Sequence, residues 1–301
     1  MHEVVTLGEP MLLLQPNAPV PLDQATSLSI DIAGAESNLA IGLSRLGHCV
    51  RFISRVGDDP FGRRIYATLA AEGVDISSLR VDPAAPTAIY FKEWLPDGMR
   101  RVFYYRRASA ASRLSPDDLR PDLFHEARIV HLTGITPALS ASCAAAVQRA
   151  FELAHEAGAL VSFDPNYRPQ LWSTAEARAA LLPLCAQADI LLMSHEDAQA
   201  LFALTDPDGI LEDTRVFSAF VVVLRRGEHG ALARAGETRI EVPAEAIADV
   251  IDPVGAGDGF NAGFLSGWLR GESLEMALRL GARIGAAAVA HAGDYAGYPR
   301  L

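Results

Sequence analysis

The stretch DPVGAGDGF, residues 252–260, lies near the end of a chain of 301 residues. Three glycines, Gly255, Gly257 and Gly259, surround Asp258, and the apolar stretch FNAGFLSGWL follows. A glycine inside a helix or strand costs about 0.5–1 kcal/mol relative to alanine. Such a density of glycine therefore indicates that another chemical group approaches this backbone closely.

The apolar stretch after these glycines predicts a helix that begins near Gly257 or Asp258. The free amide groups at a helix N-terminus, together with the helix dipole, bind anions, and phosphate is the natural guest. Asp258 then has two interpretations: it is an N-cap, or it is a general base that takes a proton from a substrate hydroxyl. Gly257, Gly259 and Ala262 also satisfy the dinucleotide-binding pattern GxGxxA. That pattern belongs in an opening strand-helix-strand unit, whereas little chain remains here.

Short apolar runs rich in β-branched residues alternate along the chain with segments of helical period. The predicted strands are VVTLGE, VRFISRVG, ARIVHLTGI, ALVSFDPN, ADILLMS and AFVVVLRRG, followed by GALARAG and ETRIEVPA. The predicted helices are ESNLAIGLSRL, FGRRIYATLAAEG, ASCAAAVQRAFELAHEAG, TAEARAALLPLCAQ, HEDAQALF, GDGFNAGFLSGWLRG and SLEMALRLGARIGAAAVAHAG. This alternation is typical of an α/β protein whose mostly parallel sheet is covered by helices on both faces. The small residues of the last helix indicate close helix packing or a flat ligand that lies against it.

Two segments interrupt this alternation. Residues 11–32 and 87–105 have the pattern of short alternating strands, with turns that contain proline and glycine. We expect them to form one small β-structure that projects from the main sheet. Two surface hairpins without a role are the alternative.

The composition excludes several classes of function. A net charge of −11 offers no basic field for nucleic acid or for an anionic membrane, so local arginines or amides must bind anionic ligands. We expect a cytoplasmic protein without a membrane span, because no basic N-terminal region precedes a long apolar run. The three cysteines are far apart and are expected to stay reduced. The only lysine, Lys92, lies in the predicted strand and turn YFKEWLPDG, which argues against a P-loop or a lysine Schiff base.

GAGD followed by FNAGFLSG, together with AGAESNLAIGLSRLG (residues 33–47) and RVGDDPFG, resembles the two signatures of the ribokinase-like (PfkB) carbohydrate kinases. The motifs follow the family's order over nearly the whole chain. The resemblance implies one ribokinase-like kinase domain over residues 1–301, a three-layer α/β/α sandwich with a β-lid made of segments 11–32 and 87–105. It also implies ATP and Mg²⁺ as cofactors, with a monovalent cation as an open addition. A homo-oligomer is expected, because lids of this type often pair between subunits.

The resemblance also implies roles for individual residues. Asp258 is the catalytic base, and Gly255, Ala256 and Gly257 form the anion hole. The implied substrate pocket consists of Gly34, Asn38, Tyr90, Tyr104, Arg106 and Arg168. The implied nucleotide site consists of Asn166, Ser194, Arg225, Gly227, Gly230, Gly255 and Gly257, with Asp197 as a metal ligand.

Three further segments, YYRRASAASRLSPDDL, FDPNYRPQLW and GDYAGYP, resemble the members of the family that phosphorylate 2-keto-3-deoxygluconate. We therefore expect ATP-dependent phosphorylation of the terminal hydroxyl of this sugar acid. The presence of Arg106 and Arg168 favours an acidic substrate, because paired guanidinium groups commonly hold a carboxylate. A neutral sugar would leave both charges without a partner. A kinase for a neutral sugar such as fructose, and a non-catalytic sensor of sugar acid or nucleotide, are the alternatives.

Two positions depart from the family's pattern. Its Asn-x-x-Glu motif, which helps to organise magnesium and phosphate, is Ser194-His195-Glu196-Asp197 here. Its lysine near the phosphates is Arg225 in the segment LRRGEHG. The acid that serves the metal and the geometry of the phosphate contact therefore stay open from the sequence.

Overall fold

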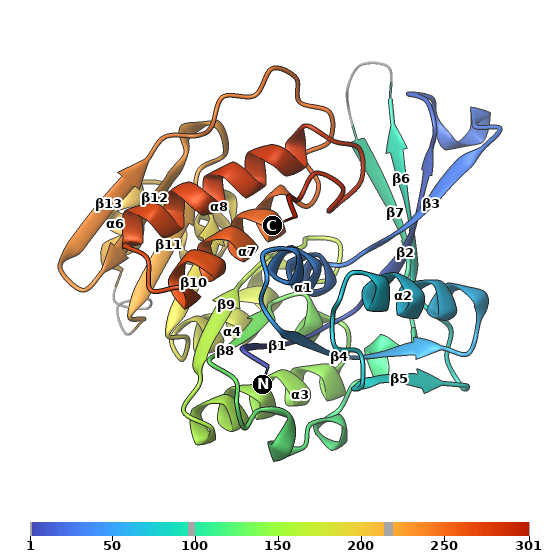
Figure 1. The fold of residues 1–301 in the computed structure, drawn as a ribbon, viewed down its shortest axis with the longest axis horizontal. Helices are drawn as coiled ribbons and strands as arrows, with labels where there is room; N and C mark the ends of the chain where they lie inside the picture. Colours follow the sequence, from blue (N-terminus) through green and yellow to red (C-terminus); the bar gives the residue numbers. More distant parts are fainter. Residues whose placement is uncertain (1, 96–99, 214–218, 301) are drawn as a thin grey trace.

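A sheet of nine strands crosses the centre of the molecule (Figure 1). The computed structural model describes residues 2–95, 100–213 and 219–300. The strands have the order β13-β12-β11-β10-β9-β8-β1-β4-β5 across the sheet. Their bounds are β1 Val4–Leu7, β4 Val50–Gly57, β5 Leu79–Asp82, β8 Ile129–Thr133, β9 Leu160–Asp164, β10 Ile190–Ser194, β11 Val221–Arg225, β12 Ala231–Ala235 and β13 Thr238–Val242. All neighbouring pairs are parallel except β11 with β12 and β12 with β13.

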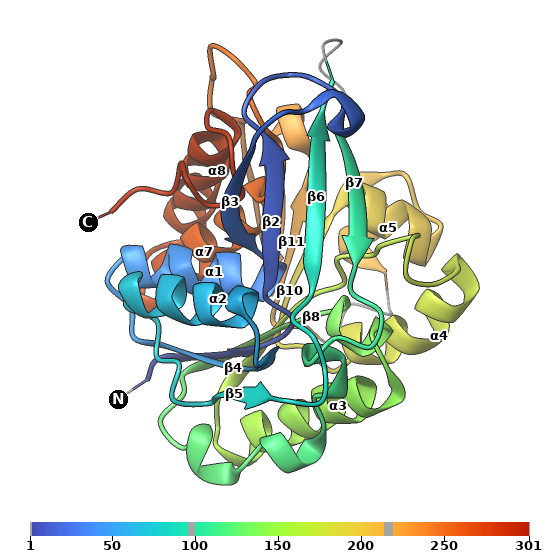
Figure 2. The same ribbon diagram turned by 90° about the vertical axis from the view of Figure 1, so that its right-hand side faces the viewer.

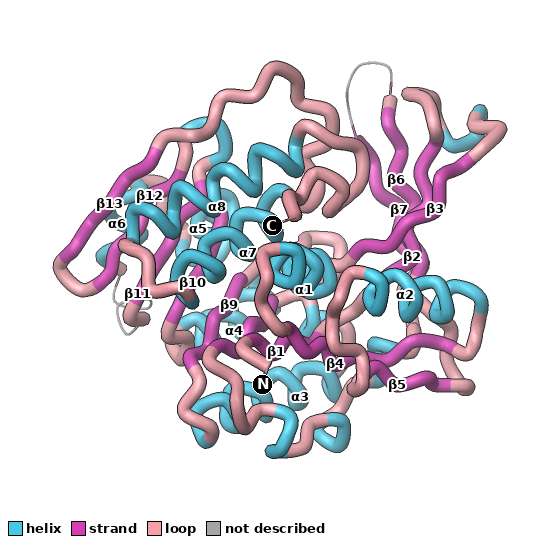
Figure 3. Tube along the Cα trace, viewed as in Figure 1, coloured by secondary structure: helices cyan, strands magenta, loops and turns pink. Residues whose placement is uncertain are grey.

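Helices cover both faces of this sheet (Figure 3). One face carries α1 Ala35–Arg45, α2 Pro60–Ala71, α7 Ala256–Leu269 and α8 Leu274–Val289. The other face carries α3 Ala141–Glu156, α4 Thr174–Cys185, α5 His195–Phe202 and α6 Pro207–Glu212. Successive side chains of a strand point to opposite faces. Val4 of β1 therefore packs in the core on the side of α1, α2, α7 and α8, and Val5 in the core on the side of α3 to α6. The predicted three-layer α/β/α sandwich is confirmed.

Polar residues lie where several of the central strands end. β1 is followed by Gly8 and Glu9, β9 ends at Asp164, and β11 ends at Arg225. Because these strands are parallel, their carboxyl ends share one edge of the sheet. The strands that follow β1 in the sequence add first on its β4 side and later on its β8 side. Ligands of open α/β sheets bind at such a reversal, outside the carboxyl ends of the strands.

A second sheet, of four strands, stands above this edge (Figure 2). We call it the lid; its order is β3-β2-β6-β7, and its strands are β2 Met11–Pro16, β3 Leu28–Ala33, β6 Ile89–Trp94 and β7 Arg100–Tyr105. The parallel pairing of β2 with β6 joins the two segments that interrupt the alternation, with Leu12 opposite Ile89. Residues 96–99 of the second segment lie outside the described residues.

The environment of Lys92 corrects one sequence-based argument. A lysine in an alternating strand is expected to be exposed, but the side chain of Lys92 in strand β6 is only 2% exposed, so that step in excluding a Schiff base is wrong. The amine of Lys92 forms ion pairs with Asp252 and Asp294 instead. A protonated, doubly paired amine is a poor nucleophile, so the conclusion against a Schiff-base lysine stands for a different reason.

Short elements account for most of the remaining differences. β5 and α6 were not predicted, because four to six residues are too few to show a clear period. Helix α7 begins at Ala256, and its N-cap is Gly255. Asp258 is therefore not the N-cap. In the described part of the chain, no helix combines the length and the apolar character needed to cross a bilayer.

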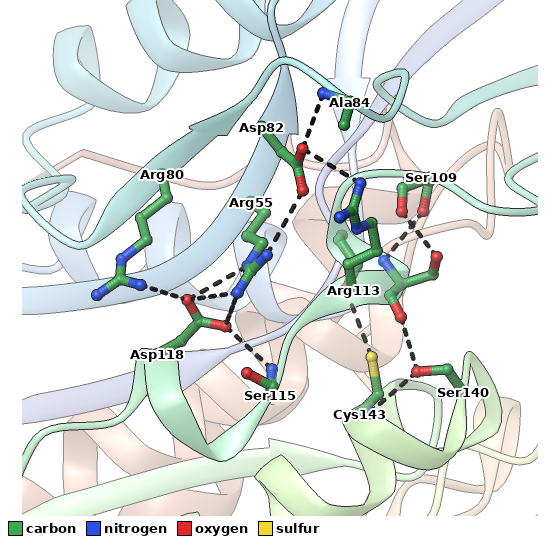
Figure 4. Close-up of polar contacts among 12 residues, drawn as sticks. Arg55, Arg80, Asp82, Ala84, Ser109, Arg113, Ser115, Asp118, Ser140 and Cys143 are labelled. Carbon is green, nitrogen blue, oxygen red and sulfur yellow. Dashed lines mark hydrogen bonds and ion pairs between the residues drawn. The ribbon is translucent and has the colours of Figure 1, made fainter.

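A network of ion pairs fixes the segment between β7 and β8 (Figure 4). Asp118, whose side chain is 2% exposed, accepts hydrogen bonds from Nε and Nη2 of Arg55 at 2.8–3.2 Å. It also accepts hydrogen bonds from Nη1 of Arg80 at 2.9 Å and from the backbone amide of Ser115 at 3.0 Å. These contacts hold the connection that leads from the lid, past Ser109, back to the main sheet.

We expect Asp118→Ala to lower the free energy of unfolding by about 2–4 kcal/mol, because the substitution removes the main partner of Arg55. The value is below that of a fully buried pair, since the side chain of Arg55 keeps 20% exposure. Urea unfolding followed by circular dichroism measures it. The matched control is Asp122→Ala, which breaks an exposed pair with Arg120 and should leave the unfolding midpoint unchanged. Equal midpoints for wild type and Asp118→Ala would show that the network contributes no net stability.

Candidate active site

A cavity of about 980 Å³ lies between the lid and the carboxyl edge of the main sheet. Its walls include the lid strands β6 and β7, the ends of β9 and β11, and the start of α7. All the residues that the sequence assigns to a site line this cavity: Gly34, Asn38, Tyr90, Tyr104, Arg106, Asn166, Arg168, Ser194, Asp197, Arg225, Gly227, Gly230, Gly255, Ala256, Gly257 and Asp258. The fold thus brings together residues from both halves of the chain.

Helix α7 begins at this cavity with an open N-terminus. Gly255 has φ +86°, and a Cβ atom there would lie 1.8 Å from the backbone oxygen of Asp294, so both the angle and the contact require glycine. No side chain from the described part of the chain caps the helix. The backbone amide of Ala256 already donates to the carbonyl of Pro253 at 3.3 Å. Among the described residues, the backbone amides of Gly255 and Gly257 are therefore the more available donors for a ligand. Such an uncapped terminus is suited to an anion.

Asp258 lies in the first turn of α7, and its side-chain hydrogen-bond partner among the residues that the structure describes is neutral. Nδ2 of Asn38 donates to its carboxylate at 2.8 Å. Burial raises the pKa of Asp258 to about 7, while the hydrogen bond from Asn38 lowers the pKa, Asp164 raises it and Arg168 lowers it. A carboxylate with a pKa near neutrality is ionised in a large fraction of molecules and still binds a proton readily. Asp258 therefore has the properties of a general base.

Asn38 also offers a free acceptor. Its Oδ1 atom is buried without a hydrogen-bond partner among the described residues, and the side chain lines the cavity. Buried polar atoms are normally paired. A ligand hydroxyl in the cavity would supply the missing partner beside Asp258.

A buried carboxylate at the end of β9 holds the first turns of α7 against the sheet. Asp164 accepts hydrogen bonds from Nδ2 of Asn261 at 2.7 Å and from Nη1 of Arg225 at 2.9 Å. Nη1 of Arg225 also donates to the carbonyl of Gly257 at 3.4 Å and contacts Oδ1 of Asn261. Burial by itself lowers the pKa of Arg225, but Asp164 and Asp197 raise it above its usual value. Arg225 is thus a fixed cation whose Nη1 is already committed to protein acceptors.

Ser194 and Asp197 form a capping box at the start of α5. Oγ of Ser194 accepts a hydrogen bond from the amide of Asp197 at 3.0 Å, and Asp197 accepts one from the amide of Tyr167 at 2.9 Å. A second amide, that of Ser194, lies 3.5 Å from the other carboxylate oxygen. Burial raises the pKa of Asp197. These contacts give Asp197 a structural role, whereas Glu196 is exposed and also lines the cavity.

The described residues form no cluster of three or more His, Cys, Asp or Glu side chains placed to hold a metal ion. A divalent cation in this cavity would therefore take most of its ligands from a bound phosphate group and from water. Glu196 and Asp197 are the acidic side chains of the departing Ser-His-Glu-Asp motif that line the cavity.

Arg106 already has a carboxylate partner. Its Nε donates to Oε2 of Glu9 at 2.6 Å, and the hydroxyl of Ser109 donates to the other oxygen of this fully buried carboxylate. The guanidinium carbon lies 5.3 Å from the ring centre of Tyr104. The expectation that a neutral ligand would leave Arg106 without a partner is therefore wrong. The Nη2 atom of Arg106 is buried without a partner among the described residues, so it stays available as a donor.

Arg168 is different. In the described part of the chain it forms no ion pair, and its Nη1 donates to the carbonyl of Tyr167 at 3.1 Å. Arg168 lines the same cavity as Asp258 and Arg106. In a chain with a net charge of −11, a half-buried guanidinium without a carboxylate marks a place where an anionic ligand would be stabilised.

One wall of the cavity is apolar and consists largely of small residues. It includes Val250 and the residues Ala282, Gly285, Ala286 and Val289 of α8. Small side chains one turn apart leave a smooth strip on a helix, as the sequence suggested. Planar ring systems bind to such surfaces, with a few polar groups fixing their orientation.

Sequence reasoning missed Glu9, Asp164 and Asp294 as members of this site. Glu9 and Asp164 share a detectable signal, because each lies at the carboxyl end of a buried parallel strand. Asp164 lies in the segment FDPNYRPQLW, from which only Asn166 and Arg168 were assigned to the site. Asp294 lies in an irregular segment after α8, where no periodic pattern identifies it.

Relatives with assigned names share most of the chain. A 2-dehydro-3-deoxygluconokinase from Thermoproteus tenax is 39% identical over 262 residues, which cover 86% of this chain and 79% of that protein. A 2-dehydro-3-deoxygalactonokinase from Haloferax volcanii is 37% identical over 86% of this chain and 81% of its own length. Fructokinase-1 from Zea mays is 36% identical over 85% of this chain and 80% of its own length.

Solved structures share the fold from end to end. A PfkB protein from Polaromonas sp. JS666 superposes with a TM-score of 0.89 at 38% identity, covering 98% of both chains. A putative ribokinase II from E. coli in complex with ATP and Mg²⁺ superposes with a TM-score of 0.91 at 27% identity, covering 100% of this chain and 96% of that one. The model of the pfkB family of carbohydrate kinases matches residues 1–301. The chain therefore belongs to the pfkB family of carbohydrate kinases.

Proposed function

We propose that this protein uses ATP to phosphorylate the terminal hydroxyl of 2-keto-3-deoxygluconate or a close stereoisomer. The position of Arg168 carries the proposal, because this residue has no ion pair within the described ranges and lines the same cavity as Asp258 and the open N-terminus of α7. A sugar acid has a carboxylate at one end and a hydroxyl at the other, so it can engage Arg168 and Asp258 together. The two relatives named for 2-dehydro-3-deoxy sugar acids support this substrate class.

Asp258 would take the proton from the sugar hydroxyl as that oxygen attacks the γ-phosphorus of ATP. The bond between the γ-phosphorus and the bridging oxygen then breaks, and ADP leaves with that oxygen. The amides of Gly255 and Gly257 face the charge that develops on the transferring group. Arg225 strengthens the positive field behind this turn, since its guanidinium lies against Gly257.

The nucleotide would lie along the apolar strip of α8, with its phosphates directed to Gly255. Gly227 and Gly230, in the turn after β11, also line the cavity, and they would border the path of the nucleotide. Mg²⁺ supplies charge neutralisation on the phosphates when it is bound. Glu196, which is exposed and lines the cavity, would orient the water ligands of the ion, while Asp197 holds the turn. The E. coli structure with ATP and Mg²⁺ supports this assignment of cofactors.

The lid would close over the sugar and exclude water, which suppresses idle hydrolysis of ATP. Its inner face carries Tyr90 and Tyr104, whose ring centres are 5.6 Å apart. Its outer face exposes Ile30, Phe103 and Tyr105, at 52%, 44% and 69%. An apolar sheet face of this kind supports pairing between two copies of the chain. We therefore propose a homo-oligomer, which sedimentation velocity would test.

Two alternatives make different demands on the cavity. A fructokinase would have no use for the unpaired guanidinium of Arg168, although a fructokinase is among the relatives. A non-catalytic sensor would not need a carboxylate whose pKa is raised to about 7 beside the anion site. Assay of purified protein with ATP, Mg²⁺ and a panel of sugar acids and neutral sugars separates the three.

Asp258→Asn should lower kcat by about 10²–10⁴-fold, because the amide keeps the shape of the carboxylate but cannot accept the proton. Coupled measurement of ADP release gives the rate, and circular dichroism checks that the variant is folded. The control Asp122→Asn changes an exposed aspartate and should leave kcat unchanged. If Asp258→Asn retained more than about a third of the wild-type rate, Asp258 would not be the base.

The pH dependence of kcat/KM should report the pKa of Asp258. Since the base must be ionised, activity should rise about tenfold per pH unit on the acid side of pH 7 and level off above it. Asn38→Ala removes a hydrogen bond that lowers this pKa, so its profile should move to higher pH. A wild-type profile that stays flat from about pH 5.5 to about pH 7.5 contradicts this assignment.

Arg168→Ala should lower kcat/KM for 2-keto-3-deoxygluconate by about 10- to 150-fold, the loss expected from one charge-assisted hydrogen bond. The loss for fructose, if fructose is turned over, should be far smaller. Arg106→Ala should cost less selectivity, because Arg106 also serves Glu9. The exposed Arg107, changed to alanine, is the control. Equal losses on both sugars, or a wild-type preference for fructose, would remove the sugar-acid assignment and leave the kinase assignment intact.

A further inference from the structure

The side chain of Lys92 leaves the lid and ends between two carboxylates of the main domain. Its Nζ lies 2.5 Å from Oδ2 of Asp252 and 2.9 Å from Oδ1 of Asp294. The three side chains are 2%, 4% and 5% exposed, respectively. The lid therefore contributes one buried positive charge to a site that holds two negative charges.

Both carboxylates belong to the segments that shape the N-terminus of α7. Oδ1 of Asp252 accepts a hydrogen bond from the amide of Val254 at 3.2 Å, and its Oδ2 accepts one from the amide of Gly293 at 3.3 Å. Asp252 thus ties the turn before α7 to the turn after α8. The backbone of Asp294 packs against Gly255 so closely that no Cβ atom fits between them. A shift of either carboxylate would therefore move the amides of the anion hole.

The charge balance requires a cation at this point. Two buried carboxylates repel each other and would also repel a phosphate at the start of α7, unless a positive charge compensates them. Burial by itself lowers the pKa of Lys92, but Asp294 and Asp252 raise it above its usual value, so the amine stays charged. Tyr90, two residues earlier on the same face of β6, donates its hydroxyl to Asp294 at 2.9 Å.

We propose that Lys92 is a positioning residue that acts as a built-in monovalent cation for the anion hole at Gly255. The inference rests on the proposed kinase function and adds two statements to it. Activity needs no dissolved potassium or sodium, because an ammonium group already occupies the place between Asp252 and Asp294. The anion hole also depends on the lid, because strand β6 delivers this charge.

Hydrogen exchange tests the positioning role without any substrate. In Lys92→Met, the amides of residues 252–258 and 293–295 should exchange at least about tenfold faster than in wild type, because the two carboxylates lose their shared partner. Arg101→Ala is the matched control; this lid residue pairs with Glu93, and its side chain is 58% exposed. It should leave both segments unchanged. Retained protection in β8, β9 and β10 identifies a folded variant. Wild-type exchange in both segments of folded Lys92→Met would overturn the proposal.

The dependence of activity on salt tests the role as a cation. With Mg²⁺ present and tetramethylammonium, which is too large for the site, as the only added monovalent cation, wild-type kcat/KM should change less than about twofold when potassium is supplied. Lys92→Ala should lose about 100-fold in kcat, as when one donor to a developing negative charge is removed. Ammonium or potassium should restore at least about tenfold of that loss, but not in Lys92→Met, whose side chain fills the space.

Each outcome separates this inference from the proposed function. Strong stimulation of the wild-type enzyme by potassium, or no rescue of folded Lys92→Ala by any small cation, overturns the role of Lys92 as a built-in cation. The wild-type titration needs no variant, so the inference can be tested even if Lys92→Ala does not fold. If wild type phosphorylates no sugar acid in any salt, the proposed function fails. The hydrogen-exchange result then still decides whether Lys92 positions the loop at Gly255.

Discussion

The contact between Gly255 and the backbone of Asp294 is the constraint on which the cavity depends. It places the start of α7 directly against the segment that follows α8, and only a residue without a side chain allows that distance. Tyr298 holds the same glycine from its other side, since its hydroxyl donates to the carbonyl of Gly255 at 2.6 Å. The helix is also fixed to the sheet, through Asn261 and Asp164. The first-turn amides can point into the cavity because the backbone that carries them is held at three points.

The charges around the cavity follow a simple division. Asp164 is paired with Arg225, and Asp252 and Asp294 share Lys92. Asp258 is the carboxylate among these that has an amide as its hydrogen-bond partner rather than a cation. Its neighbours therefore leave the proton affinity of Asp258 high, while the paired carboxylates are held in fixed positions. An acidic chain can in this way bind anions and still keep one carboxylate available for proton transfer.

Much of the fold could be predicted from the sequence, because strands covered on both faces produce uninterrupted apolar runs and the helices between them keep a 3.6-residue period. The lid was visible for a different reason, since its two segments interrupt the alternation of strands and helices with short strands and turns that contain proline and glycine. Contacts between distant residues were not predictable. Glu9 precedes the first lid strand and Arg106 follows the last one. Their ion pair therefore joins residues that are far apart in the sequence, and no local sequence pattern predicts it. The burial of Lys92 depends on acids from the far end of the chain, whereas a lysine in an alternating strand normally faces water.

The resemblance assigned site residues within its motifs, and these residues line one cavity in the structure. It implied Asp197 as the metal ligand, and the backbone contacts of Asp197, which hold the turn before α5, could not be predicted from the departing motif Ser-His-Glu-Asp. Arg225 is a similar case. A guanidinium has several donors, so the sequence cannot say which of them are taken up by Asp164 and Asn261.

The burial of the only lysine has a practical chemical consequence. Reagents that acylate amines find one side-chain target in the whole chain, and in the structure described here that target is enclosed between the lid and two carboxylates. Acylation of Lys92 therefore requires strand β6 to separate from the main domain. The rate at which Lys92 is acylated therefore measures how often the lid opens. For the same reason, enzymes that acetylate exposed lysines would find no lysine side chain to modify while the lid stays in place.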